Sequence, residues 1–158
     1  MACCSRYAAA DITGRDSPYA LVDSSLILGT MRQVIVDSHS RVATVAGGAR
    51  LKDVAAAAGA HGLVTALGNC GAVGMAGLTL GGGYGPLNGL YGLAVDNLLG
   101  AEVVLADERR VTVGPDEEAE LFWAIRGGGG NFGVVTSMRV QLHCMRRVTC
   151  WLGRLCFR

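Results

Sequence analysis

The sequence predicts an α+β domain in which strands and a few helices follow one another irregularly. Short β-branched segments bounded by turn residues occur in both halves of the chain. The two helical segments between them do not give regular βαβ winding. The 158 residues are 51% hydrophobic and only 17% charged, which argues against disorder and is enough for one domain with a buried core.

Three candidate strands and a helix fill the first part of the chain. The strands are SSLIL at 24–28, QVIVD at 33–37 and RVATVAG at 41–47. Each is short, contains β-branched residues and lies next to turn residues. LKDVAAAAGAHGL at 51–63 follows as an alanine-rich helix, and Gly59 and Gly62 indicate its end.

The second half of the chain contains two strands, a helix and a last strand. NLLGAEVVLADERRVTVG at 97–114 predicts two strands joined by a turn near Asp107. PDEEAELFWAIRGG at 115–128 predicts a helix, because Pro115 suits a first helical turn and acidic residues favour the positive end of the helix dipole. FGVVTSMRVQL at 132–142 is the last predicted strand.

The charge distribution gives no reason to expect a nucleic acid or a membrane as partner. Net charge is +1, which does not favour polyanions or anionic lipid surfaces. No charged residue occurs from Val54 to Val95, but repeated glycines and Pro86 interrupt this run, so no transmembrane helix is predicted. The start, MACCSRYAAAD, lacks a secretory signal pattern, and we expect a cytoplasmic protein.

The cysteines predict neither a disulfide framework nor a metal site. Five of the six lie near the ends, namely Cys3, Cys4, Cys144, Cys150 and Cys156. Only Cys70 belongs to the body of the chain, so no framework is implied. His143 stands beside the C-terminal cysteines, but the paired spacing of structural zinc ligands is missing there.

A glycine-rich segment from Gly68 to Gly85, GNCGAVGMAGLTLGGGYG, occupies the middle of the chain. Such density of glycine weakens helices and strands and indicates close approach of the backbone to something. One interpretation is a tightly packed cluster of turns without a ligand. The other is a loop whose exposed N–H groups hold the pyrophosphate of a dinucleotide-like ligand. The residues alone leave both open.

The second glycine motif, GGGGNFG at 127–133, does not indicate a Rossmann site. It contains a formal G-x-G-x-x-G, but a helix is predicted before it and a strand after it. A Rossmann fingerprint needs the reverse order and an acidic residue about 20 positions later. No acidic residue follows Gly133, and the Walker phosphate-binding motif is absent from the chain.

Three segments in order resemble the FAD-binding domain of berberine-bridge-enzyme-like oxidases, in the vanillyl-alcohol oxidase / p-cresol methylhydroxylase (PCMH) superfamily. They are GNCGAVGMAGLTLGGGYG, YGLAVDNLLGAEVVLADERRV and ELFWAIRGGGGNFGVVTSMRVQLH. The resemblance implies a PCMH-type FAD-binding domain, with an antiparallel or mixed sheet flanked by helices. It assigns residues 1–143 to a partial domain and leaves 144–158 as a tail that does not match.

The same resemblance implies a set of residues that contact FAD. In that family the cysteine at the position of Cys70 forms a thioether to the flavin, and the strand that contains Val135 reaches the adenine by its backbone. Leu78 stands where plant members often have a histidine, and Asn97 ends a G-L-A-x-D-N stretch near the cofactor. The implied FAD-binding residues are Cys70, Gly71, Ala72, Val73, Gly74, Gly77, Leu78, Gly81, Asn97 and Val135.

The chain departs from the family pattern at both ends. Members with two covalent links carry a histidine in a glycine-rich segment, and Ala10 of AAADITGR takes its place here. The family continues past His143 into a substrate domain, whereas this chain continues into CMRRVTCWLGRLCFR. We therefore expect a domain truncated at both ends, or read there from an altered frame.

The resemblance implies a FAD-dependent oxidoreductase that transfers a hydride from an activated C–H bond of an alcohol, sugar or amine to FAD. Oxygen or another acceptor would reoxidise the flavin. The alternatives are a non-catalytic remnant that binds FAD and a glycine-rich interaction module without flavin. The expected partner is a small-molecule substrate, and no residue is assigned as catalytic because the family's catalytic residues follow the matched part.

Overall fold

The central element is a five-stranded antiparallel sheet in the order β1-β2-β6-β4-β5. The computed structural model describes residues 28–145 of the chain. The strands are β1 (Val34–Asp37), β2 (Val42–Ala46), β4 (Leu98–Val104), β5 (Arg110–Val113) and β6 (Val134–Gln141). The α+β prediction is confirmed, and these five strands lie within segments that the sequence predicted.

The pairing of the sheet joins distant parts of the chain. Strand β6 lies in the middle, where it pairs with β2 through Val45 and Met138 and with β4 through Ala101 and the same Met138. The hairpin between β4 and β5 turns at Glu108, which adopts a left-handed φ of 67°. The sheet thus brings the beginning and the end of the described chain side by side.

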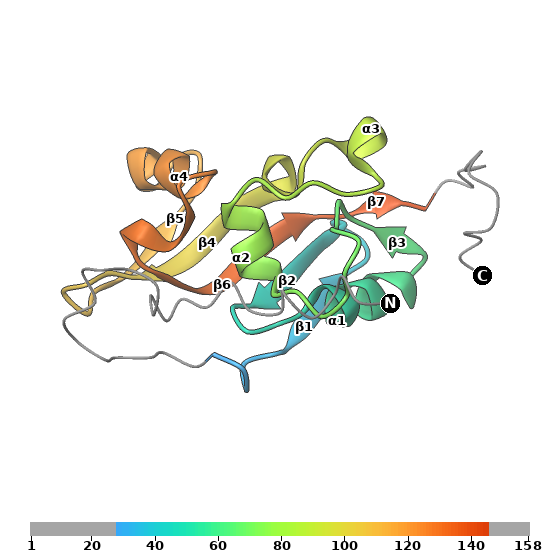
Figure 1. Ribbon diagram of the computed structural model, residues 1–158, viewed down its shortest axis with the longest axis horizontal. Helices are drawn as coiled ribbons and strands as arrows, with labels where there is room; N and C mark the ends of the chain where they lie inside the picture. Colours follow the sequence, from blue (N-terminus) through green and yellow to red (C-terminus); the bar gives the residue numbers. More distant parts are fainter. Residues whose placement is uncertain (1–27, 146–158) are drawn as a thin grey trace.

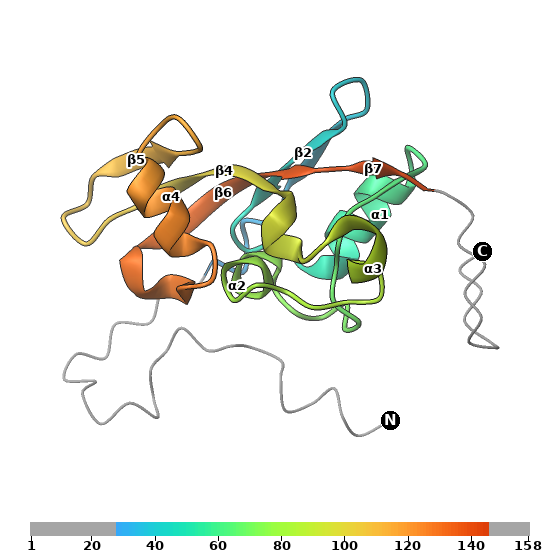
Figure 2. The same cartoon turned by 90° about the horizontal axis from the view of Figure 1, so that it is seen from above.

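The helices α1 (Leu51–Gly59), α2 (Met75–Leu80) and α4 (Ala119–Ile125) lie on one face of this sheet (Figures 1 and 2). The core forms between them and the inward residues of the strands. Its largest fully buried side chains are Leu51, Met75, Ile125, Met138 and Leu142. The opposite face of the sheet carries exposed polar residues such as Thr44 and Arg139, which pair across β2 and β6.

The helix predicted at 115–128 is shorter than expected and begins at Ala119. Glu118 precedes it with a left-handed φ of 47°, and the amide of Gly114 donates to the carbonyl of Glu117 at 2.7 Å. This turn takes the acidic residues at 116–118 out of the helix. Pro115 therefore lies in the turn before the helix, and not in the first turn of the helix as predicted.

Several short elements were not predicted from the sequence. They are β3 (Leu63–Val64), α2, α3 (Asn88–Tyr91), the 3-10 helices η1 (Ala94–Asn97) and η2 (Gly129–Phe132), and β7 (His143–Cys144). Strands β3 and β7 pair with each other in a second, two-stranded sheet. Most of them surround the glycine-rich segment, so the fold puts its irregular part there.

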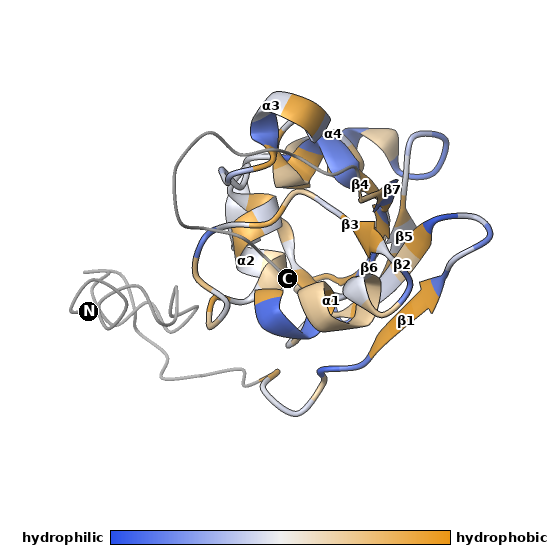
Figure 3. Cartoon of the chain, turned by 90° about the vertical axis from the view of Figure 1, so that its right-hand side faces the viewer, coloured by the Kyte–Doolittle hydropathy of each residue, from blue (hydrophilic) through white to orange (hydrophobic). Residues whose placement is uncertain are grey.

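The edge strand β1 is largely hydrophobic and lies at the border of the molecule (Figure 3). The side chain of Ile35 in this strand is 56% exposed. The segments SSLIL, except for Leu28, and AAADITGR lie outside the described residues, as does the tail after Met145. Within residues 28–145 no helix is long and apolar enough to cross a membrane.

Candidate functional site

The glycine-rich segment contains a short helix, α2, with one buried and one bare face. Met75 and Thr79, four residues apart, are both fully buried against the core. Gly74, Gly77 and Gly81 lie on the other side and are exposed, because residues three and four apart share one face of a helix. We call these three residues the glycine strip.

The surroundings of each glycine show whether close packing explains the absence of a side chain there. Among residues 28–145, a Cβ atom added at Gly74 or Gly77 would meet nothing within 4 Å, and at Gly81 it would reach only carbonyls of the same helix. At Gly83 it would lie 2.5 Å from the Cβ of Ala94, and at Gly85 it would lie 1.7 Å from a carbonyl oxygen. Close packing thus requires the later glycines, but no packing contact within the described part of the chain requires the strip.

The loop before α2 is held on the first turn of α1. The amide of Leu51 donates to the carbonyl of Val73 at 2.9 Å, and the amide of Lys52 donates to the carbonyl of Gly71 at 3.1 Å. A side chain at Gly71 would come within 3.1 Å of the Cβ of Lys52. The loop therefore lies close to α1 with its path fixed.

Three amides of this loop are available for a ligand. Among the described residues, the N–H groups of Asn69, Gly71 and Ala72 donate to no other residue. Asn69 and Ala72 are exposed, and Gly71 is half-buried. Successive free amides in a glycine-rich loop form a concave site for anionic oxygens. This loop and the glycine strip are continuous along the chain.

Cys70 lies in the middle of this loop and is half-buried. It is disulfide-bonded, and Cys144 is the free cysteine of the described part of the chain. The sequence did not predict this bond, because it gave no disulfide framework. Any other chemistry of this sulfur therefore begins with reduction.

Asn97 lies apart from the loop, at the end of η1, with its side chain buried. Its Nδ2 donates to the carbonyls of Tyr91 at 3.0 Å and Leu93 at 2.8 Å, and its Oδ1 lies 2.6 Å from Nε2 of His143. All polar atoms of the side chain are engaged within the protein. The geometry thus gives Asn97 a role in holding the segment around it.

Hydrogen bonds connect η1 to the end of the glycine-rich segment. The amides of Ala94 and Val95 donate to the carbonyls of Gly83 at 2.9 Å and Gly82 at 3.0 Å. Helix α2 also contacts η1 and η2. The structure therefore brings residues 70–81 and the segment of Asn97 into one region.

The last two predicted contact residues have packing roles. Leu78 is half-buried on α2, where one of its methyl groups would lie 3.3 Å from a Cβ added at Gly68. Val135 is 4% exposed on β6, and its carbonyl oxygen would lie 2.2 Å from a Cβ added at Gly47. Its backbone thus faces the β2 side of the sheet, and the glycine strip belongs to a different element.

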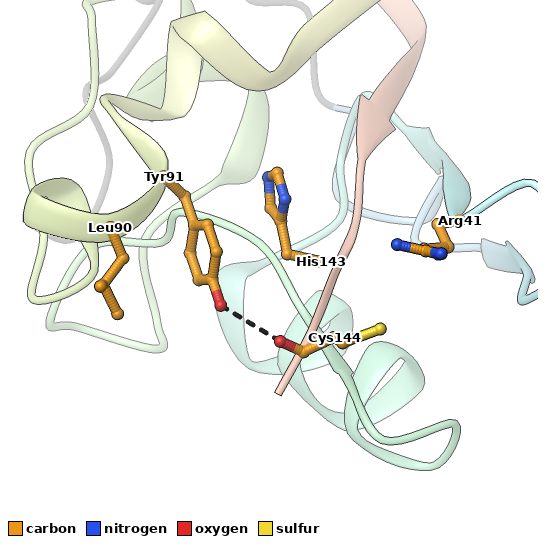
Figure 4. Close-up of a pocket in the computed structure, with 5 residues that line it drawn as sticks. All are labelled: Arg41, Leu90, Tyr91, His143 and Cys144. Carbon is orange, nitrogen blue, oxygen red and sulfur yellow. Dashed lines mark hydrogen bonds between the residues drawn. The ribbon is translucent and has the colours of Figure 1, made fainter. Parts of the chain in front are cut away.

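A pocket of about 430 Å³ lies where β7 passes α3 (Figure 4). The rings of Tyr91 and His143 stack there with centroids 4.2 Å apart and planes at 7°. The hydroxyl of Tyr91 donates to the carbonyl of Cys144 at 3.1 Å. Arg41 and Leu90 complete the lining. The sequence analysis did not find this group, because its members are brought together only by the fold.

Burial lowers the pKa of His143 below its ordinary value, and the charge of Arg41 lowers it further. The imidazole is therefore neutral at pH 7.

A second pocket, of about 500 Å³, lies along α4 beside the exposed Trp123. The glycine strip lines neither of these two pockets.

Residues 14–114 match the model of the family described as the FAD binding domain. The match covers more than half of the chain, so this protein belongs to that family. The implied cofactor, FAD, and the resemblance to FAD-linked oxidases are thereby confirmed. A glycine-rich interaction module without flavin has no support in this match.

Particular relatives agree with this assignment. FAD-linked oxidoreductase pgmH of Aspergillus terreus is 48% identical over 116 residues, which are 73% of this chain and 24% of the relative. BBE-like 1 of Physcomitrella patens has a TM-score of 0.70 at 33% identity, with 73% of this chain and 25% of that one covered. This chain spans about a quarter of the length of the curated relatives it matches.

A third relative carries a covalent flavin. Glucooligosaccharide oxidase of Acremonium strictum, whose structure concerns the roles of its 6-S-cysteinyl, 8α-N1-histidyl FAD, has a TM-score of 0.68 at 43% identity. The match covers 72% of this chain and 24% of that one. These similarities also confirm the predicted fold class, a partial PCMH-type domain.

The described residues fit a dinucleotide such as FAD. The strip offers backbone without side chains in an open region, and the loop before it offers free amides. Pyrophosphate oxygens accept hydrogen bonds from such amides, and a bare helix face permits close approach of a long ligand. Of the two interpretations of the glycines, packing explains Gly83 and Gly85, and among the described residues it does not explain the strip.

Proposed function

We propose that this chain forms the cofactor-binding part of a FAD-dependent oxidoreductase and that FAD lies along the glycine strip. The observation that carries the proposal is the strip itself: Gly77 lies inside α2 and a Cβ atom there would meet no described residue within 4 Å, although glycine inside a helix costs about 1 kcal/mol relative to alanine. No contact within the described chain explains that cost. A ligand that needs bare backbone does.

Different residues would contribute to the site in different ways. The amides of Gly71 and Ala72 would donate to the pyrophosphate, and Gly74, Gly77 and Gly81 would allow close approach. Val73 and Leu78 supply apolar packing beneath the loop and helix, since both pack against the core cluster. When bound, FAD supplies a two-electron acceptor for the hydride of an activated C–H bond.

Two predicted residues would act less directly. Asn97 would hold η1 in place, because its side chain is saturated within the protein. Val135 would contribute through its backbone in the sheet. A direct contact of either residue with FAD stays a prediction. The hydrogen bonds of Asn97 favour a role in holding η1 in position.

Cys70 would hold the flavin covalently once its disulfide is reduced. The motif around it, Gly68 to Gly74, has the order that the family resemblance implies, and a relative is described with a 6-S-cysteinyl FAD. A thiolate is the reactive form of cysteine, and neighbouring amides favour it. The S–H bond and the C–H bond at the flavin carbon that receives the sulfur would both break and release protons, and the two electrons released on forming the carbon–sulfur bond would pass to oxygen, which becomes hydrogen peroxide.

The substrate would be a small molecule with an activated C–H bond, in an alcohol, a sugar or an amine. The name of the Acremonium relative, a glucooligosaccharide oxidase, supports the sugar class. The catalytic residues would come from outside the described part, since no predicted contact residue among 28–145 is placed as an acid or base at the strip. A cytoplasmic location remains part of the proposal.

An absorbance spectrum tests the cofactor directly. The purified chain is mixed with FAD, freed of excess ligand by gel filtration, and scanned in the visible range. We expect the flavin bands to elute with the protein and to be shifted relative to free FAD. Elution of all flavin in the small-molecule fraction would contradict the proposal.

A further inference from the structure

The orientation of the Asn97 side chain is fixed by two hydrogen bonds. Its Nδ2 donates to the carbonyl oxygens of Tyr91 and Leu93. Only a nitrogen can donate to those carbonyls, so the amide oxygen must point the other way. That oxygen, Oδ1, lies 2.6 Å from Nε2 of His143.

This orientation determines which nitrogen of His143 carries the proton. An amide oxygen accepts and never donates, so Nε2 of His143 must be protonated. Burial keeps the ring neutral by lowering its pKa, which leaves Nδ1 without a proton. The structure therefore fixes one tautomer of this histidine, the Nε2–H form.

Two further contacts join the segment that contains His143 to the segment that contains Tyr91 and Asn97. Its ring stacks on that of Tyr91, whose hydroxyl donates to the backbone of Cys144 (Figure 4). These contacts link residues 46 and 53 positions apart in the chain. We call the four residues Tyr91, Asn97, His143 and Cys144 the histidine clasp.

The clasp is connected to the glycine-rich segment through η1. Asn97 ends η1, and the amides of Ala94 and Val95 at its start hold the carbonyls of Gly83 and Gly82. A Cβ atom at Gly83 would overlap the Cβ of Ala94, so the backbone of Gly83 lies directly against Ala94. Gly82 and Gly83 follow Gly81, the last member of the glycine strip.

We infer that His143 is a positioning residue for cofactor binding: its Nε2–H, through Asn97 and η1, holds the glycine strip in the conformation that accepts FAD. This inference rests on the proposed function. The pathway is continuous, because each step is a hydrogen bond or a backbone contact given above. Loss of the donor leaves the buried oxygen of Asn97 without its partner, which weakens the attachment of η1.

Two substitutions of His143 separate the donor from other properties of the ring. In His143→Gln the amide nitrogen takes the place of Nε2 and keeps the donor. In His143→Asn the shorter side chain puts its nitrogen at the place of Nδ1 and cannot reach Asn97. Both variants are polar, and both lose the aromatic stack, so they differ chiefly in the hydrogen bond.

The dissociation constant of FAD is measured by flavin fluorescence, well below the unfolding midpoint of every variant. We expect His143→Gln to bind within about threefold of the unmodified chain, and His143→Asn to bind about tenfold more weakly. A merely structural clasp would lower the unfolding midpoint of His143→Asn without changing the dissociation constant. Equal binding by both variants, whether strong or weak, would overturn the inference.

The tautomer is tested independently of FAD. Nitrogen-15 NMR of the labelled apo chain at pH 8 distinguishes protonated from unprotonated ring nitrogens. We expect Nε2 of His143 to be protonated and Nδ1 not, and the opposite pattern would overturn the clasp. If the tautomer is as expected but the unmodified chain binds no FAD, the proposed function fails, and with it the positioning role, while the clasp stands.

Discussion

Cys70 lies in a loop whose backbone is tied down on both sides. Its own carbonyl accepts from the amide of Val73 at 3.2 Å, and the carbonyl of Gly71 accepts from Lys52. The sulfur is disulfide-bonded, so the loop can take up covalent flavin only under conditions that free it. Covalent attachment of the flavin therefore depends on the chemical state of the Cys70 sulfur.

The prediction for Cys70 is covalent attachment after reduction. The chain is reduced, incubated with FAD, returned to air and precipitated with acid. We expect yellow flavin in the pellet of the unmodified chain, and in the supernatant for Cys70→Ala, which should still bind FAD through the glycine backbone. Mass spectrometry of tryptic peptides should map the adduct to Cys70. Release of all flavin from the unmodified chain would limit Cys70 to packing.

His143 should make the stability of the domain depend on pH. Its pKa is lowered by burial and by Arg41, while in the unfolded chain it returns to about 6.5. The unfolded state then binds more protons below that value, so the stabilising contribution is present above pH 6.5 and is lost as pH falls. Tyr91 and Cys144 are the other titratable groups in contact with it.

Urea unfolding midpoints at pH 7.5 and pH 5.5 measure this dependence. We expect the unmodified chain to lose more stability between the two conditions than His143→Gln, which has no titrating ring. The carboxylates of Asp37 and Asp107, whose pKa values are lowered by hydrogen bonds, act at lower pH and equally in both proteins. An equal loss in both proteins would mean that His143 is not the group that titrates.

The sequence could propose residues of the site only where they follow one another in a local motif. The motif around Cys70 and its glycines is continuous in sequence, so the resemblance could locate it. The partner of Asn97 could not be found in this way, because His143 is 46 residues distant and the pairing of β4 with β6, in which Leu98 lies opposite Val140, brings the two segments together. The hydroxyl of Tyr91, too, bonds to a residue 53 positions away, which no local pattern indicates.

Helix α2 is the element on which the functional account depends. Its buried face consists of Met75, Thr79 and Leu80, and its other face is the glycine strip. The hydroxyl of Thr79 is buried without a hydrogen-bond partner in the described chain, so the helix is held mainly by packing of its apolar face. A helix with three bare positions on its exposed side gains little from its own propensity.

Gly77→Ala should therefore separate stability from cofactor binding. The new methyl group meets no described residue within 4 Å, so the apo chain should gain about 0.5–1 kcal/mol from the better helix propensity. The same methyl group would occupy the surface that FAD approaches, and FAD affinity should fall by about tenfold or more. Urea unfolding and fluorescence titration give the two quantities.

Gly59→Ala is the matched control. Gly59 ends α1, and a Cβ there also meets nothing within 4 Å. It should stabilise the apo chain to a similar extent while leaving FAD affinity unchanged. If Gly77→Ala and Gly59→Ala behave alike in the titration, the glycine strip is not the surface that contacts FAD.

The elements themselves were predictable in proportion to how regular they are. The strands of the main sheet and α1 have clear β-branched or alanine-rich patterns. Helix α2 was missed because glycine at three positions in eight opposes a helix, and tertiary packing of Met75 overrides that preference. The start of α4 was misplaced because Pro115 suits a turn as well as a helix.

At the scale of the whole molecule, the domain covers one face of its sheet with helices and leaves the glycine strip on an open surface. The five strands of the sheet pair with one another, with two shifts of register between β4 and β6. FAD would bind the folded chain and gain nothing from the unfolded one. A ligand of this kind raises stability by mass action.

The measurement that tests the central claim most directly is thermal unfolding of the whole chain with increasing FAD. Because FAD would bind only the folded state, the unfolding midpoint should rise steadily with the FAD concentration. At one hundred times the dissociation constant, FAD should add about 2.7 kcal/mol to the free energy of unfolding. Riboflavin, which lacks the pyrophosphate and adenine, should raise it far less. A midpoint that stays constant up to millimolar FAD would contradict the assignment of the glycine strip as a FAD site.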